Sequence, residues 1–126
     1  MDEGIDPKKT IYKTRVENLD IIPASVDLAG AKIELVALEG REKRLKNALA
    51  RVSESYDYIL LDCPPSLGLL TINALTAVDS VLIPIQCEFY ALEGVSQLVS
   101  TIQLVNTNLN PKLEIEGVLR DRKSVV

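Results

Sequence analysis

The sequence predicts an α/β fold in which a parallel β-sheet carries helices on both faces. Apolar residues make up 47% of the 126 residues but aromatic residues only 4%, so the core must consist of aliphatic side chains, as in parallel sheets covered by helices. Short aliphatic runs typical of strands alternate along the chain with segments whose apolar residues recur at helical spacing. Strands joined in this way form right-handed crossovers and place functional loops at their carboxyl ends.

The first half of the chain predicts one strand and two helices. An apolar run over residues 18–23 is closed by proline, and Ser25 is a suitable cap for a helix over residues 26–38. Gly40 ends this helix. A second helix follows, because apolar residues recur at i, i+3, i+4 and i+7 and form one stripe: Leu45, Ala48, Leu49 and Val52.

Residues 56–62 give the clearest strand prediction. Their centre, Ile-Leu-Leu, is continuously apolar without alternation, which suits a strand buried on both faces of a parallel sheet. Pro64 and Pro65 have no amide hydrogen for a strand ladder, so we expect the strand to end at Asp62. A loop then leads into a short helix over residues 69–76.

The second half predicts two further strands around a long helix. The strands are residues 80–85 and 113–119, and the helix is residues 91–108, which Pro111 separates from the final strand. The apolar residues of this helix lie at helical spacing: Leu92, Val95, Val99, Ile102 and Val105.

Charge and composition exclude several classes of function. The 14 basic and 18 acidic side chains give a net charge of −4, so no global basic field attracts this chain to nucleic acid. The acidic first residues lack the basic and apolar blocks of a signal peptide, and no apolar run approaches membrane-spanning length. We therefore expect a cytoplasmic location. Cys63 and Cys87 fit no zinc spacing, and we expect both to be reduced thiols.

Asp62 needs an explanation, because a carboxylate at the end of a buried strand is costly unless a cation or hydrogen-bond donors meet it. Three roles are open from the residues alone. Asp62 is a solvated strand-end or helix-capping carboxylate, the phosphate-accepting Asp of a receiver domain, or a Walker B carboxylate. A Walker B carboxylate holds the water shell of a nucleotide-bound Mg²⁺.

The residues that follow Asp62 resemble a known signature. Asp-Cys-Pro-Pro-Ser-Leu-Gly at residues 62–68 is similar to the hydrophobic strand plus Asp-x-Pro-Pro motif of the ParA/Soj/MinD group of partitioning ATPases. The likeness to the Soj branch covers residues 56–94, includes residues 18–24 and 28–31, and runs to Leu119. This coverage makes the resemblance far more specific than an isolated Asp-x-Pro-Pro.

The resemblance implies a P-loop NTPase fold of the deviant Walker A, SIMIBI-like type, and an ATPase that uses ATP and Mg²⁺. It implies that Asp62 contacts Mg²⁺ through water and that Pro64, Pro65 and Gly68 belong to a switch segment at the nucleotide. For Gly68 and Thr71, backbone geometry and helix capping compete with that role. Intact relatives are implied to form ATP-dependent homodimers, to bind DNA nonspecifically at the nucleoid, and to segregate chromosomes or plasmids with a ParB-like partner, without a membrane.

One part of such a site is not in the sequence. A phosphate cradle requires a glycine-rich loop with Lys-Ser or Lys-Thr, and none of the glycines is followed by either pair: Gly4, Gly30, Gly40, Gly68, Gly94 and Gly117. We therefore expect residues 1–119 to be the central part of a single ATPase domain whose Walker A loop lies upstream. Alone, this partial chain should have no catalytic residue, bind neither ATP nor Mg²⁺, and be poorly soluble because a sheet edge is unpaired.

Residues 120–126 depart from the family pattern. The last six of them, Asp-Arg-Lys-Ser-Val-Val, match the translation of a common sequencing adapter. We expect residues 120–126 to be a non-family tail of artefactual origin rather than a basic tail. An intact genomic locus that encodes these residues would contradict this expectation.

Two alternatives to the interpretation of this chain as part of an ATPase remain. A receiver-like signalling domain requires Thr or Ser at the end of the strand after the Asp and Lys at the end of the next strand. Here the strand over residues 80–85 leads into Gln86 and Cys87, and the final strand has no matching Lys. The second alternative is a nonenzymatic α/β scaffold that binds no nucleotide. Residues 88–90, Glu-Phe-Tyr, are expected on the same rim as Asp62, where they either pack a loop or face a nucleotide or a dimer partner.

Overall fold

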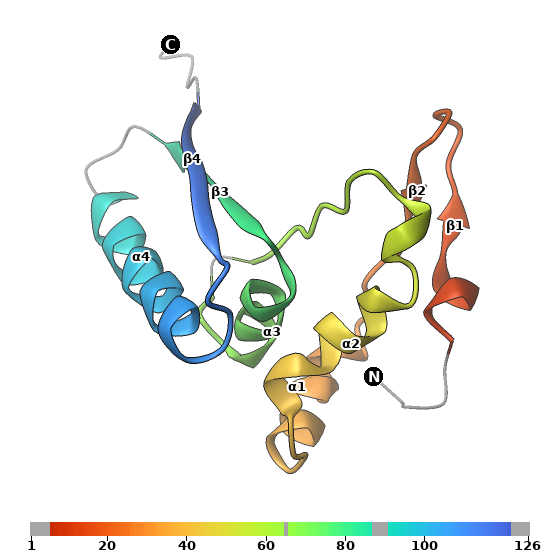
Figure 1. Ribbon diagram of the computed structural model, residues 1–126, viewed down its shortest axis with the longest axis horizontal. Coiled ribbons are helices and arrows are strands. Elements are labelled where there is room, and N and C mark those ends of the chain that lie inside the picture. Colours follow the sequence, from red (N-terminus) through yellow and green to blue (C-terminus); the bar gives the residue numbers. More distant parts are fainter. Residues whose placement is uncertain (1–5, 65, 87–90, 122–126) are drawn as a thin grey trace.

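The structure is a computed structural model that describes residues 6–64, 66–86 and 91–121 (Figure 1). Its helices are α1 (Leu28–Val36), α2 (Arg44–Ala50), α3 (Leu69–Ala77) and α4 (Ala91–Asn108), with short 3-10 helices η1 (Pro7–Thr10), η2 (Arg41–Lys43) and η3 (Ser53–Ser55). Its strands are β1 (Tyr12–Lys13), β2 (Asp20–Ile21), β3 (Ser80–Gln86) and β4 (Glu114–Asp121).

Strands β3 and β4 form a parallel pair, joined through α4 as a βαβ unit. The register runs from Ser80 opposite Glu114 to Gln86 opposite Asp121. A core forms where α3, α4 and the pair meet: Leu75, Ile83, Ile102, Val105 and Leu113. The predicted strands and helices of residues 69–119 are therefore confirmed, with bounds that differ by at most two residues. None of the described helices combines the length and the apolarity that crossing a membrane requires.

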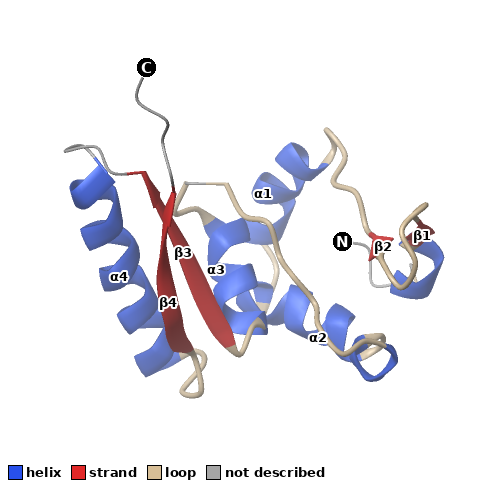
Figure 2. Ribbon diagram, turned by 90° about the horizontal axis from the view of Figure 1, so that it is seen from above, coloured by secondary structure: helices blue, strands red, loops and turns tan. Residues whose placement is uncertain are grey.

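The two faces of the β3–β4 pair differ in burial. Alternation along β3 directs Val81, Ile83 and Ile85 toward the core that α3 and α4 cover (Figure 2). Leu82 points to the other face and is 57% exposed. Leu119, which lies opposite Pro84 on that face, is 56% exposed. The α/β class with a parallel sheet is confirmed, and in the described part of the chain the face of Leu82 is open to solvent.

Helices α1 and α2 pack against α3. Leu35 of α1 and Val52, which follows α2, are buried. Gly40 separates the two helices with a φ of +64°, in the left-handed region that favours glycine, so the predicted break is confirmed. Both helices are shorter than the predicted ranges, because turns replace their terminal residues and Val52 contributes to the core from outside α2.

Asn73 fixes α2 to α3 through its buried side chain, which is 1% exposed. Its Oδ1 accepts a hydrogen bond from the Leu45 amide at 3.3 Å, and its Nδ2 donates to the Leu69 carbonyl at 3.1 Å. Lys43 at the N-cap of α2 makes no capping bond. Asn73 therefore satisfies one of the free amides at the start of α2 from a neighbouring helix.

The predicted strand over residues 18–23 is much shorter and pairs differently. Only Asp20–Ile21 is a strand, and it pairs antiparallel with Tyr12–Lys13. Thr14 and Asn18 shape the turn between them: Thr14 Oγ1 donates to the Leu19 carbonyl at 2.7 Å, and Asn18 has a φ of +60°. A local hairpin therefore replaces the expected strand of the parallel sheet.

The predicted buried strand over residues 56–62 is wrong for this chain. These residues have no strand pairing, and Tyr58 and Leu60 are 87% and 92% exposed. An extended segment becomes a strand only when a neighbouring backbone satisfies its amides and carbonyls. Among the described residues, neither strand pair extends to this segment, so its apolar side chains have no face to bury.

Candidate functional site

Asp62 lies in an exposed loop between the extended segment and α3. Its side chain is exposed, and within the described part of the chain its carboxylate makes no hydrogen bond or ion pair. The predicted position at the end of a buried strand is therefore wrong, because the preceding residues form no strand. The predicted loop after Asp62, which leads into a helix over residues 69–76, is confirmed.

Cys63 follows Asp62 and is a free, exposed thiol. Its Sγ donates to the Leu61 carbonyl at 3.7 Å. Packing around the sulfur raises the pKa of the Cys63 thiol, and the Asp62 carboxylate raises it further. The thiol is therefore protonated at neutral pH and is a poor nucleophile. Cys87 and residues 88–90 lie outside the described residues.

Gly68 is the N-cap of α3, with a φ of −84° and a ψ of −175°. This extended conformation is open to any residue, and a Cβ at this position would meet no atom within 4 Å. Neither backbone geometry nor packing in the described part of the chain requires glycine here. Pro64 is exposed, and Pro65 lies outside the described residues.

Thr71 connects the loop to α3. Its side chain is 5% exposed, and its hydroxyl donates a hydrogen bond to the Ser66 carbonyl. Thr71 is the third residue of the helix and Gly68 is the N-cap, so helix capping by Thr71 is excluded. The bond to Ser66 has no signal in the sequence, because any Thr in a first helical turn reads as a capping or solvent-facing residue.

The loop fits a metal that is held through water. Among the described residues, no three carboxylate or thiol side chains gather into a group that encloses a metal ion directly. A single exposed carboxylate without a protein partner instead suits the water shell of Mg²⁺, which keeps several of its waters when it binds to a protein. Asp62 is the described loop residue with that chemistry.

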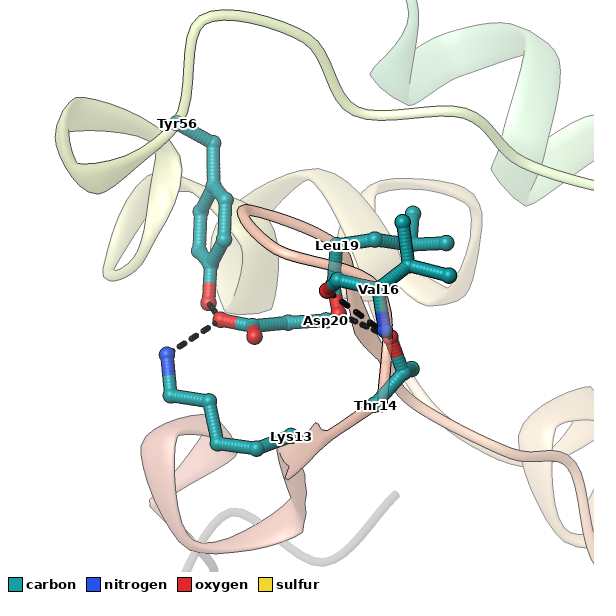
Figure 3. Close-up of polar contacts among 6 residues, drawn as sticks. All are labelled: Lys13, Thr14, Val16, Leu19, Asp20 and Tyr56. Atoms are coloured by element: carbon teal, nitrogen blue, oxygen red, sulfur yellow. Dashed lines mark hydrogen bonds and ion pairs between the residues drawn. The ribbon is translucent and has the colours of Figure 1, made fainter.

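Three polar side chains, Lys13, Asp20 and Tyr56, form a cluster that joins the hairpin to the extended segment (Figure 3). The sequence did not predict this cluster. Asp20 Oδ2 accepts hydrogen bonds from Lys13 Nζ and from the Tyr56 hydroxyl, each at 2.7 Å. The bond from Lys13, followed by the bond from Tyr56, lowers the pKa of the Asp20 carboxyl. The same contacts with Asp20 raise the pKa of Lys13 and the pKa of Tyr56.

Asp20 and Tyr56 are separated by 36 residues, and no periodicity connects them. A signal for this contact would have to come from tertiary structure, since Asp20 reads as a polar residue in a short strand and Tyr56 as the start of another. The three side chains hold the beginning of the extended segment beside the hairpin.

Comparison with known proteins identifies the family. Residues 2–115 match the family model described as AAA domain. Soj, the sporulation initiation inhibitor protein of Bacillus subtilis (strain 168), is 67% identical over 109 residues. The chromosome partitioning protein ParA of Myxococcus xanthus (strain DK1622) is 56% identical over 112 residues.

The fold has solved counterparts. Cobyrinic acid a,c-diamide synthase from Mycobacterium smegmatis, solved with a bound ATP analog and magnesium, matches with a TM-score of 0.87 and 43% identity. That match covers 92% of this chain and 47% of the synthase.

The two curated relatives are longer than this chain. The matches cover 86% and 89% of the chain, but only 43% of Soj and 40% of ParA. The family match also decides against a receiver domain, because residues 2–115 belong to a different family. The chain is a member of the AAA-domain family and is homologous over most of its length to the sporulation initiation inhibitor protein Soj and the chromosome partitioning protein ParA.

Proposed function

We propose that this chain forms the magnesium side of the nucleotide site in a ParA/Soj-type partitioning ATPase. The observation that carries the proposal is the Asp62 carboxylate, exposed and without a partner among the described residues, in the loop that leads into α3. In this role Asp62 is the Walker B residue, and it binds Mg²⁺ through water. A Mg²⁺ held there would supply positive charge to the nucleotide phosphates.

The loop after Asp62 is proposed to sense the nucleotide. Pro64 and Pro65 restrict the backbone of this loop, since each fixes its own φ. Gly68 has no Cβ, and a Cβ built at this position would have no protein atom within 4 Å. The space beside the backbone at the start of α3 is therefore open. A phosphate group could approach this backbone more closely than it could approach any other residue type.

The wider role is proposed from the relatives. ATP and Mg²⁺ are the cofactors, and the partners are a second copy of the protein, nonspecific DNA and a ParB-like protein. The activity is segregation of a chromosome or plasmid in the cytoplasm, at the nucleoid. With a net charge of −4, this chain has no overall attraction for DNA, so the proposed DNA contact is local.

Sequence identity favours partitioning over amide synthesis. The chain is 56% identical to the chromosome partitioning protein ParA of M. xanthus but 43% identical to the M. smegmatis synthase. The similarity to the synthase supports a shared fold and a shared nucleotide chemistry, because fold alone does not determine function.

A hybrid protein tests the role of Asp62. The 109 matched residues of B. subtilis Soj are replaced by those of this chain, and Mg²⁺-dependent ATP hydrolysis is measured for the hybrid. We expect Asp62→Asn to lower turnover by about 10- to 100-fold, the range for residues that act on a metal from its outer shell. Asp57→Asn is the matched control, since Asp57 is an exposed carboxylate in the same segment, and it should leave turnover unchanged.

Two results would contradict the proposal. Equal turnover of the Asp62→Asn and Asp57→Asn hybrids would remove Asp62 from the metal site. A hybrid that folds, as judged by circular dichroism, but hydrolyses no ATP would favour the nonenzymatic scaffold.

A further inference from the structure

Helix α3 contains three buried polar side chains, Thr71, Asn73 and Thr76, which are 5%, 1% and 1% exposed. Each makes a hydrogen bond, as buried polar groups must. The Thr76 hydroxyl donates to the Ile72 carbonyl of its own helix at 2.7 Å. Asn73 joins α3 to α2. Thr71 differs from both, because its hydroxyl reaches backward out of the helix to the Ser66 carbonyl.

The loop has little else to fix it to α3. Gly68 at the N-cap supplies no side-chain bond, and Ser66 and Leu67 are exposed. Within the described residues, the Thr71 hydroxyl is the side-chain donor from α3 that bonds to the loop over residues 62–68. α3 itself is a firm support, since the bond between Asn73 and the Leu45 amide and the buried residues Ala74 and Leu75 hold it in the core.

We propose that Thr71 is a positioning residue that holds the loop over residues 62–68, and with it Asp62, against α3. Ser66 lies four residues after Asp62, and both Pro64 and Pro65 lie between them. The prolines stiffen this stretch, so fixing the Ser66 carbonyl limits where the Asp62 carboxylate lies. The significance of this for Mg²⁺ rests on the proposed function, whereas the ordering of the loop does not.

NMR relaxation of the backbone amides of the 126-residue chain tests the ordering, because within the described residues the loop amides donate no hydrogen bond that would slow their exchange with solvent. The reporting amides are those of Cys63, Ser66, Leu67 and Gly68, since the prolines have none. Thr71→Val keeps the shape of the side chain and removes the hydroxyl, and Thr71→Ser keeps the hydroxyl. Thr76→Val is the matched control, because Thr76 is equally buried in α3 but bonds only within the helix.

We expect the order parameters of the loop amides to fall in Thr71→Val from about 0.85, typical of a rigid backbone, toward about 0.6, typical of a flexible one. Thr71→Ser should give the order parameters of the unsubstituted chain, and Thr76→Val should leave those of the loop amides unchanged. Unchanged loop order parameters in Thr71→Val, or the same fall in Thr76→Val, would overturn the proposal. If the Val variant does not fold in this chain, the same relaxation comparison is made in the Soj hybrid, where the same outcomes decide.

In the hybrid, the Mg²⁺ dependence of ATP hydrolysis distinguishes a positioning role of Thr71 from a purely structural one, because a purely structural role would leave that dependence unchanged. In Thr71→Val we expect the Mg²⁺ concentration for half-maximal hydrolysis to rise severalfold while the KM for ATP at saturating Mg²⁺ is unchanged, and Thr71→Ser should restore the original value. An unchanged Mg²⁺ dependence would remove the link to the metal. If instead Asp62→Asn has no effect on hydrolysis, the proposed function fails, while the relaxation result still decides the role of Thr71.

Discussion

Glycine at position 68 has two possible explanations, one structural, in which it caps α3, and one functional, in which it lets a nucleotide approach the backbone closely. Its backbone conformation is accessible to all residues, and a Cβ added there would meet no atom within 4 Å. A glycine at a helix N-cap is nevertheless favoured over alanine, because its bare backbone leaves the first helical amides accessible to water. Helix capping and close approach of a nucleotide therefore make different predictions for two substitutions.

For Gly68→Ala we expect the free energy of unfolding of the 126-residue chain to fall by no more than about 1 kcal/mol, because only the cap is affected. In the Soj hybrid the same substitution should lower ATP turnover, since the new Cβ stands where the nucleotide is proposed to lie. Gly68→Ser separates the two effects. Ser restores a capping side chain, so stability should recover while turnover stays low. Recovery of turnover in the Ser variant would assign Gly68 to capping alone.

At the scale of elements, a charge-assisted hydrogen bond from Tyr56 to Asp20 joins the extended segment to the hairpin. Asp20 accepts from both Lys13 and Tyr56 (Figure 3), and such bonds are stronger than those between neutral groups. The lowered pKa of Asp20 means that this group stabilises the fold above its ordinary value of 3.8 and loses that effect as the pH falls through the lowered pKa.

The raised pKa values of Lys13 and Tyr56 affect stability at alkaline pH. They stabilise the fold below the ordinary values of 10.5 and 10.0, and this contribution disappears as the pH rises through the raised values. The three-residue contact is therefore complete between about pH 4 and pH 10.

Tyr56→Phe should lower the melting temperature of the 126-residue chain within that pH window. The difference from the unsubstituted chain should disappear when the pH falls through the lowered pKa of Asp20, because a protonated Asp20 no longer gains from the contact. Tyr58→Phe is the control, since Tyr58 is 87% exposed in the same segment. A difference that persists unchanged in strong acid would mean that the Tyr56 hydroxyl acts through another contact.

At the scale of the whole molecule, the described structure leaves large apolar side chains in water. Tyr58 and Leu60 on the extended segment are 87% and 92% exposed, and Leu82 on β3 is 57% exposed. Exposed apolar groups beside an unpaired strand edge favour association between chains. Poor solubility of the isolated chain stays a prediction, and these side chains give it a physical basis.

We expect the 126-residue chain alone to hydrolyse no ATP above a buffer blank. Its sequence has no glycine-rich loop with Lys-Ser or Lys-Thr, so the phosphates would lack a cradle of amides and a lysine. The measurement is phosphate release with and without Mg²⁺, and the Soj hybrid is the positive control. Turnover by the chain alone that requires Mg²⁺ and Asp62 would show that its own residues form a complete site.

The amino-acid sequence by itself determined the elements whose stabilising partners lie within this chain. Helices α3 and α4 and strands β3 and β4 were predicted to within two residues, because each has an apolar pattern that a neighbouring predicted element can bury. It also determined the family, through the residues around Asp62, and the position of Asp62 at the start of a loop that leads into a helix.

Tertiary structure alone decided the remaining features. Residues 56–62 have the composition of a buried strand, yet strand formation depends on a paired backbone, and none is present among the described residues. The contacts of Asp20 with Tyr56, of Asn73 with Leu45, and of Thr71 with Ser66 likewise depend on where the chain returns in space. Periodicity and motifs record which side chains a segment can bury. The partner of a polar group, by contrast, is set by the packing of segments that are distant in sequence.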